Sequence, residues 1–261
     1  VVEDKKGNQY VWIPCTTKQS DIKLQYKRTI WDVEEDNNTK ALKDELTLTD
    51  KNITFLQTNI DNGITTDIAK EIVEQINVEK QSIDKYDGYY IGRYEVGKEN
   101  EIAVVKSNQT TYTNVTWKQA YELAKGIGGG ERAATYLCSS HSWDTAINFI
   151  QNNGAKDYAI STKGFNENWY SETVTDLSGN VIKEANKEQK LETGKTKPKS
   201  NIFDMGGNVG EFTTEINPGV EDSIIIRGYG TKYDNPGGKR SDIAAKDKYR
   251  NYGFRPILIL K

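Results

Sequence analysis

Apolar residues recur at helical spacing in three segments of the chain. In residues 65–83, apolar positions return about every four residues and form one stripe, which predicts an amphipathic helix packed on one face. Residues 116–125 repeat this pattern, with a threonine and a glutamine in capping-box positions. Residues 142–150 form a third stripe behind Ser142, which we expect to cap that helix. The pattern therefore predicts three amphipathic helices.

Short runs of aromatic and β-branched residues predict strands at 9–14, 87–97, 223–230 and 252–260. The second run opens with an Asp-Gly turn signal, and the last two are apolar at consecutive positions, as buried strands are. The helices precede a late region of strands and loops. This order favours an α+β fold over alternating α/β units.

Two stretches are polar instead of periodic. Residues 32–64 predict a polar insertion near the N-terminus. Residues 178–200 alternate charges and carry almost no apolar side chain, which predicts an exposed charged loop. No internal repeat divides the chain. We therefore expect residues 1–261 to form a single domain that contains the polar insertion and the charged loop.

Composition narrows the classes of function. Only 35% of residues are hydrophobic, but fifteen Tyr, five Trp and six Phe supply large buried surfaces, which argues against disorder throughout. A net charge of -3 predicts neither nucleic-acid nor membrane-surface binding. No run approaches the roughly 20 apolar residues that cross a bilayer. Because the chain starts VVEDKK without a signal-like segment, we expect a fragment or processed form of a longer protein.

Cysteine and histidine are too scarce for the common catalytic and zinc sites. Cys15 and Cys138 could pair, although we favour two separate thiols. His141, the one histidine, stands in CSSHSWD and is predicted to be a loop residue before a helix. A structural zinc site takes about four such ligands, and the chain has three. The glycine-rich residues 126–131 lack the Lys-Ser/Thr of a phosphate-binding loop and predict a helix-ending loop.

The segment FDMGGNVGEF, residues 203–212, places Asp204 and Glu211 around three glycines. Gly206 and Gly207 let the backbone curl so that carbonyl groups can point inward. Hard cations such as calcium prefer several carboxylate and carbonyl oxygens, so this spacing is competent to bind one. Local chemistry alone nevertheless favours a tight turn with two solvated acids.

Motifs spread over residues 86–260 follow the order of a known family. NIFDMGGNVGEF, IIIRGYG and YGFRP resemble the D-M-x-G-N-V-x-E-W, R-G-G and closing G-F-R motifs of the formylglycine-generating enzyme family, also called the sulfatase-modifying-factor family. Upstream, YYIGRYEVG, VTWKQAYELAK and YLCSSHSWDTAINFI are similar to its early strand, its Trp-containing first helix and its R-L-P-T-E-A-E-W-E segment. YVWIP also looks like the start of bacterial and phage members.

The resemblance implies a C-type-lectin-like fold, with two helices around small sheets and a long irregular region that forms the ligand surface. It also implies a calcium ion in the FDMGGNVGEF segment, held by the side chains of Asp204 and Glu211 and the carbonyls of Gly207 and Val209. Where the family has W-E-W this chain has G-E-F, so one packing aromatic residue is missing.

The resemblance does not extend to the family's chemistry. Its oxidase branch binds copper through two cysteines after R-G-G, and residues 227–255 contain none. Its iron-dependent sulfoxide-synthase branch needs a histidine triad, which one histidine does not supply. We therefore expect neither reaction, and no copper, iron or zinc.

What the resemblance leaves is a scaffold that displays a binding loop, as in bacterial and phage relatives. We expect a non-catalytic ligand-binding domain of adhesin or receptor-binding type, extracellular, on a cell surface or on a virion, that recognises a protein or glycan. Tyrosine and arginine are favoured at recognition surfaces. The residues expected to contact the ligand are Tyr229, Lys232, Tyr233, Asn235, Lys239, Arg240, Tyr249, Arg250 and Tyr252.

Three alternatives stay open at this point. The loop could be ordinary solvated surface. The chain could be a structural subunit of a pilus or phage tail fibre whose loops pack on neighbouring subunits. It could also be an enzyme with a non-standard site, which predicts a pocket with converging titratable groups near Arg227 and Arg255. The excess of basic residues in the loop suggests an acidic partner.

Overall fold

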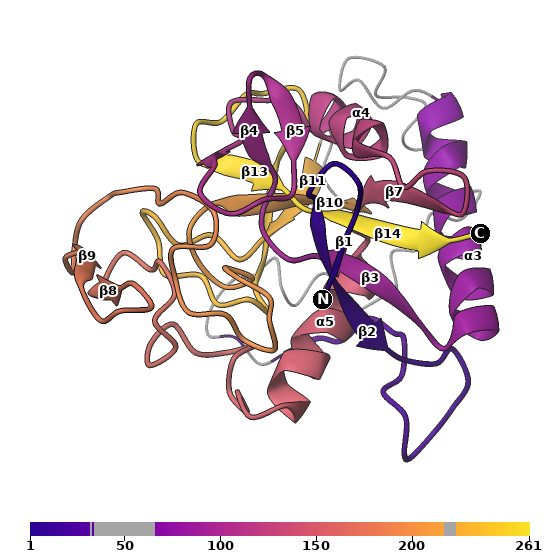
Figure 1. The fold of residues 1–261 in the computed structure, drawn as a ribbon, viewed down its shortest axis with the longest axis horizontal. Coiled ribbons are helices and arrows are strands. Elements are labelled where there is room, and N and C mark those ends of the chain that lie inside the picture. The colour runs from indigo at the N-terminus through magenta and orange to yellow at the C-terminus, as the bar shows by residue number, and fades with distance from the viewer. Residues whose placement is uncertain (32, 34–65, 217–222) are drawn as a thin grey trace.

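The computed structural model describes residues 1–31, 33, 66–216 and 223–261, and this part of the chain is a mixed α+β structure (Figure 1). Within it, there are three helices and four sheets. The polar insertion predicted for residues 32–64 lies, apart from Val33, outside the described residues. No helix in the described part is long and apolar enough to cross a membrane.

A five-stranded antiparallel sheet forms the centre of the molecule (Figure 1). In spatial order its strands are β1 (Val2–Glu3), β2 (Gln9–Pro14), β3 (Gly88–Gly92), β14 (Pro256–Leu260) and β7 (Ala133–Leu137). The predicted strand at 9–14 is thereby confirmed, and β3 follows the predicted Asp-Gly turn. Because β3 pairs with both β2 and β14, the first and last parts of the chain share one sheet.

Two apolar cores cover the two faces of this sheet. Alternate residues of a strand point to opposite faces, so Ile257 and Ile259 join one core while Leu258 joins the other. Trp143 of α5 packs in the first core and Trp117 of α4 packs in the second. The three helices are α3 (Thr66–Tyr86), α4 (Trp117–Ile127) and α5 (Ser140–Asn152). All three predicted helices are therefore present.

The helix starts differ in how well the sequence predicted them. At α4, the expected capping box is confirmed, since the Thr116 hydroxyl accepts from the Gln119 amide and the Gln119 side chain accepts from the Thr116 amide. At α5, the expected Ser142 cap is wrong. Ser139 is the cap and accepts from the Ser142 amide at 3.1 Å, because the Ser142 hydroxyl instead donates to the buried Glu79 at 2.9 Å.

A second sheet carries the late part of the chain. In spatial order its strands are β12 (Arg240–Ala244), β11 (Ser223–Arg227), β10 (Gly210–Ile216) and β13 (Tyr252–Phe254). The apolar run at 252–260, predicted as one strand, is two: it breaks at Arg255, with β13 in this sheet and β14 in the central one. Arg255 is therefore buried between the two sheets.

Two smaller sheets complete the described part. They comprise β5 (Ile102–Val104), β4 (Gly97–Glu99) and β6 (Thr110–Thr111), and the hairpin of β8 (Val174–Thr175) and β9 (Val181–Lys183). The hairpin lies at the left edge of Figure 1 and opens the stretch 178–200, which was expected to be exposed. The first half of the stretch 178–200 is largely exposed, but Lys183 and Leu191 are buried. The Lys183 ammonium group is accommodated because it donates to three backbone carbonyls.

Candidate functional site

Four tyrosines gather where the irregular segments around β12 return to β13. We call Tyr229, Tyr233, Tyr249 and Tyr252 the tyrosine cluster. Ring centroids are 4.8 Å apart for Tyr249 and Tyr252, 5.2 Å for Tyr229 and Tyr252, and 5.8 Å for Tyr229 and Tyr233. Tyr229 is 5% exposed and Tyr233 is 57% exposed, so the cluster runs from the interior to the surface. Such packed rings give a rigid contact area with little freedom to lose on binding.

A hollow of 370 Å³ lies beside the tyrosine cluster. We call it the charged hollow, and its lining residues are Glu188, Lys190, Thr231, Arg250 and Asn251. The Asn251 side-chain amide donates to the Tyr229 hydroxyl at 3.0 Å and so joins the hollow to the cluster. Arg250 pairs with Glu188 at 2.9 Å across the hollow, with the arginine side chain 76% exposed.

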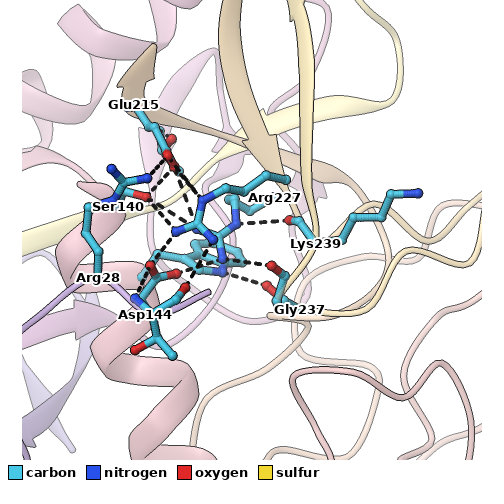
Figure 2. A network of polar contacts seen from close by, with 12 residues as sticks. Arg28, Ser140, Asp144, Glu215, Arg227, Gly237 and Lys239 are labelled. Atoms are coloured by element: carbon cyan, nitrogen blue, oxygen red, sulfur yellow. Dashed lines mark hydrogen bonds and ion pairs between the residues drawn. The ribbon is translucent and has the colours of Figure 1, made fainter. Parts of the chain in front are cut away.

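A buried ion cluster joins the ends of β11 and β12 that flank residues 228–239. Its members are Arg28, Asp144, Glu215, Arg227 and Arg240. Figure 2 shows the carboxylates of Asp144 and Glu215 converging on the Arg227 guanidinium, which lies 2.7 Å from Asp144. Arg240 pairs with both carboxylates, and Arg28 pairs with Glu215. Arg227 and Arg240 are direct partners on β11 and β12, so the cluster fixes the two strands from which the site loops leave.

The protonation states follow from this pairing. Burial by itself would raise the pKa of Glu215, but Arg240, Arg28 and Arg227 outweigh burial and lower that pKa to about 2. Burial and the neighbouring Arg240 lower the pKa of Arg227 to about 10, which leaves it charged at neutral pH. Glu215 and Arg227 are thus both ionised at neutral pH. Removing one partner of a buried ion pair leaves an uncompensated charge, so such a cluster holds its strands firmly.

The expected ligand contacts divide into two groups. Arg250 lines the charged hollow, and Tyr229, Tyr233, Tyr249 and Tyr252 form the tyrosine cluster beside it.

Lys232, also exposed, lies over the Tyr233 ring at 5.5 Å. Asn235 is half-buried and its carbonyl accepts from the Trp169 indole at 3.2 Å. Arg240 was expected on the ligand surface, yet it is 0% exposed, because Asp144 and Glu215 hold its guanidinium inside.

Lys239, the neighbour of Arg240, begins the approach to β12. Its carbonyl accepts from Arg227 at 3.0 Å, and Figure 2 shows its side chain pointing away from the buried ion cluster. The Lys239 backbone thus supports the start of β12, while a ligand contact by its side chain stays a prediction. Arg240 is held inside by the buried ion cluster.

The FDMGGNVGEF segment does not fit the calcium site that the family resemblance implies. The Arg255 guanidinium donates to both carboxylate oxygens of Glu211, at 2.6 to 3.2 Å. The Val209 amide donates to Glu95, and Asp204 faces Glu167. In the described ranges, no group of three or more His, Cys, Asp or Glu side chains could hold a metal ion. A guanidinium thus neutralises the carboxylate that calcium would need.

The glycines of this segment have another role than the one predicted. Left-handed backbone occurs at Asp204 (φ 53°) and Asn208 (φ 49°), and not at Gly206 or Gly207. A Cβ atom on Gly207 would lie 2.9 Å from the backbone nitrogen of Asn168. The glycines therefore permit two segments of backbone to pack closely, while the short polar residues adopt the left-handed turns.

Asn208 connects segments that are distant in the sequence, a role that sequence reasoning missed. Its side chain donates to Glu95 at 2.7 Å and accepts from Asn168 at 2.8 Å and from the Leu191 amide at 3.0 Å. The stretch that carries Glu188 and Lys190 is thereby fixed against the loop. Glu188, Lys190 and Thr231 were also missed as site residues. The alternating charges around Glu188 gave the one signal, and they indicated only a solvated surface.

The cysteines and the histidine are enclosed. Cys15 and Cys138 are free, buried thiols, as favoured from the sequence. Burial raises the pKa of Cys15 to about 12 and that of Cys138 well above its usual value, so neither is a thiolate at neutral pH. His141 lies inside α5 and not before it, and its ring stacks on Tyr26 with centroids 5.6 Å apart.

Arg227 and Arg255, near which the alternative of a non-standard enzyme predicts a pocket, are both fully buried in ion pairs. Their guanidinium groups therefore do not reach the surface that a substrate would approach. The arrangement at the tyrosine cluster and the charged hollow can instead bind a ligand by stacking, hydrogen bonding and charge.

No family model matches the chain, and no curated protein matches it. Similar solved structures include variable protein 1 of Treponema denticola (16% identity, TM-score 0.45), CarF (15%, 0.45) and PvdO from Pseudomonas aeruginosa (14%, 0.41). Each match covers 67% of this chain, and 85%, 87% and 81% of the respective neighbour. Likeness at this level does not assign the chain to a family or a function.

Proposed function

We propose that this chain is a non-catalytic ligand-binding domain that contacts a protein or glycan through the tyrosine cluster and the charged hollow. The main observation behind the proposal is that exposed side chains stand on loops with a rigid, buried base. Exposed Tyr233 and Arg250 stand on loops whose flanking strands are fixed by the buried ion cluster. A rigid base reduces the ordering that binding must impose, and preorganisation of this kind raises affinity.

The proposed fold is C-type-lectin-like, within the formylglycine-generating enzyme family. Support comes from the order of the sequence motifs and from an arrangement of helices around small sheets with long irregular segments. We place the protein outside the cell, on a cell surface or on a virion. This location, and a role in a pilus or tail fibre, rest on the sequence resemblance alone.

A direct test screens the intact chain against glycan and peptide arrays and compares it with three variants. We expect Tyr233→Ala to weaken binding of any ligand found by about tenfold or more, because truncating a central aromatic contact costs over about 1 kcal/mol. Arg250→Ala should weaken it similarly. Ile22→Ala is the matched control, because Ile22 is an exposed apolar residue in another part of the chain. Unchanged binding by both site variants would count against the proposal.

A further inference from the structure

The walls of the charged hollow combine two cations with one carboxylate. Glu188 accepts from the Arg250 guanidinium at 2.9 Å and from the Asn251 amide at 3.4 Å, with the same carboxylate oxygen. The Lys190 ammonium donates to the Arg250 carbonyl at 2.6 Å and to the Thr113 hydroxyl at 3.0 Å. The side chains are thus held in place, and their summed charge is positive.

Hydrogen-bonding capacity remains unused at three points of this wall. Lys190 has three N–H donors, of which the described residues take two. The second carboxylate oxygen of Glu188 accepts no hydrogen bond from the described part of the chain. Thr231 is 0% exposed, and its hydroxyl oxygen is buried without a partner among the described residues. A buried polar atom without a partner is unusual and indicates a group that a water or ligand completes.

Electrostatics favours an anion here. Burial, and then repulsion by the nearby Arg250, lower the pKa of Lys190. An anionic group between Lys190 and Arg250 would be attracted to both cations. Glu188 adds a second preference, because its second oxygen can accept a hydrogen bond from a hydroxyl group.

We propose that the charged hollow binds a carboxylated sugar, a sialic acid or a hexuronic acid, of an acidic glycan. The sugar carboxylate lies between Lys190 and Arg250, and ring hydroxyls donate to Glu188 and pair with the Thr231 hydroxyl. The tyrosine cluster offers ring faces to the apolar C–H groups of the same or the next sugar. The volume of 370 Å³ falls within the range of small-molecule sites. This inference rests on the proposed function and names its ligand class.

An acidic peptide satisfies these groups less well. An aspartate or glutamate side chain would pair with the two cations, but it has no hydroxyl to donate to Glu188. A sugar hydroxyl both donates and accepts, so it suits Glu188 and Thr231 together.

The test titrates the intact chain with sialyllactose and, separately, with a glucuronate-containing disaccharide, by calorimetry. Lactose and the methyl ester of the glucuronate disaccharide are the neutral controls, so the two arms distinguish the two acids. We expect at least one acidic sugar to bind about tenfold or more tightly than its neutral partner, because hydrogen bonds to charged groups contribute that much.

Variants locate the binding. Arg250→Gln should weaken binding of the acidic sugar about tenfold, whereas Lys248→Gln, which removes an exposed charge outside the hollow, should leave it unchanged. Thr231→Val should weaken binding a few-fold without lowering the melting temperature, because the hydroxyl has no partner in the described protein. If Thr231 had a purely structural role, Thr231→Val would lower the melting temperature and leave binding unchanged.

The outcomes separate this inference from the proposed function. If both acidic sugars bind no better than their neutral partners, the inference fails. The proposed function still stands if an array ligand, such as an acidic peptide, binds in a manner that depends on Tyr233. If no array ligand depends on Tyr233 or Arg250, both fail.

Discussion

Arg255 and Glu211 form an ion pair at the position where the motif suggested a calcium site. Arg255 also donates to the carbonyls of Gly92 and Phe203, at 2.9 and 2.8 Å, so it ties the central sheet to the FDMGGNVGEF segment. The Arg255 guanidinium thus supplies the positive charge that a calcium ion was expected to supply. The motif letters alone did not reveal it, because Arg255 lies 44 residues beyond Glu211 and meets it only in the folded chain.

Stability should therefore depend on Arg255 and not on calcium. Added calcium or a chelator should leave the melting temperature unchanged. Arg255→Met should lower the free energy of unfolding by about 3 to 5 kcal/mol, because Glu211 is then buried without a partner. Chemical denaturation measures this loss. Arg250→Met, which breaks an exposed pair, should cost no more than about 1 kcal/mol. A calcium-dependent rise in melting temperature would contradict this account.

The carboxylates near Arg255 predict how stability varies with pH. Burial, with Asp204 adding to it, raises the pKa of Glu211 from 4.5 to about 7 against the opposing effect of Arg255. A raised pKa in the folded state means that the contribution is full below pH 4.5 and is lost as pH rises through about 7. Glu215, whose folded pKa is lowered to about 2, contributes above 4.5 and loses its effect as pH falls towards 2.

We therefore expect the melting temperature to be highest near pH 4.5 and to fall as the pH rises from there through about 7. Glu167→Gln should raise stability at alkaline pH and flatten this fall. Burial and Asp204 raise the pKa of Glu167, and one oxygen of each carboxylate lacks a partner in the described residues. A glutamine places a neutral amide donor beside Asp204. The test measures the melting temperatures of the wild type and Glu167→Gln across pH. If the two proteins lost stability in parallel as the pH rises, this explanation would be wrong.

At the scale of elements, local patterns predicted most of the fold. The helical stripes gave α3, α4 and α5, since a single apolar face is visible in the sequence. The strands β2, β3 and β11 followed from their aromatic and β-branched runs. The break at Arg255 was not predictable, because an arginine inside an apolar run gives no sign of the carboxylate that it meets.

The element that matters most for function is the β11–β12 pair, fixed by the buried ion cluster. Asp144 of α5 accepts from both Arg227 and Arg240. Asp144→Asn keeps the shape but removes one negative charge. We expect it to lower the free energy of unfolding by about 3 kcal/mol or more and to speed amide exchange in residues 228–239. Asp157→Asn, at an exposed position shortly after α5, is the matched control and should behave like the wild type.

At the scale of the whole molecule, the candidate site was only half visible from the sequence. The tyrosines and Arg250 stood out because they share one loop-rich region. The other side of the charged hollow comes from Glu188 and Lys190, in a stretch whose composition indicated only solvated loop. Asn208 brings that stretch alongside through bonds to Leu191. Such contacts depend on the path of the folded chain, which brings distant segments together, and they leave no periodic signal in the sequence.

The molecule also has a second, less polar groove, between β5 and α4. Ile102, which is exposed, and Leu123 line it, in a hollow of 560 Å³. We propose that ligands bind at the tyrosine cluster and the charged hollow, and not in this groove.

Hydrogen–deuterium exchange on the intact chain, with and without an array ligand or sialyllactose, tests this claim most directly. We expect bound ligand to slow exchange in residues 186–191 and 228–252 and to leave α4, residues 117–127, unchanged. Protection confined to α4 would place the binding site in the apolar groove and contradict the proposal.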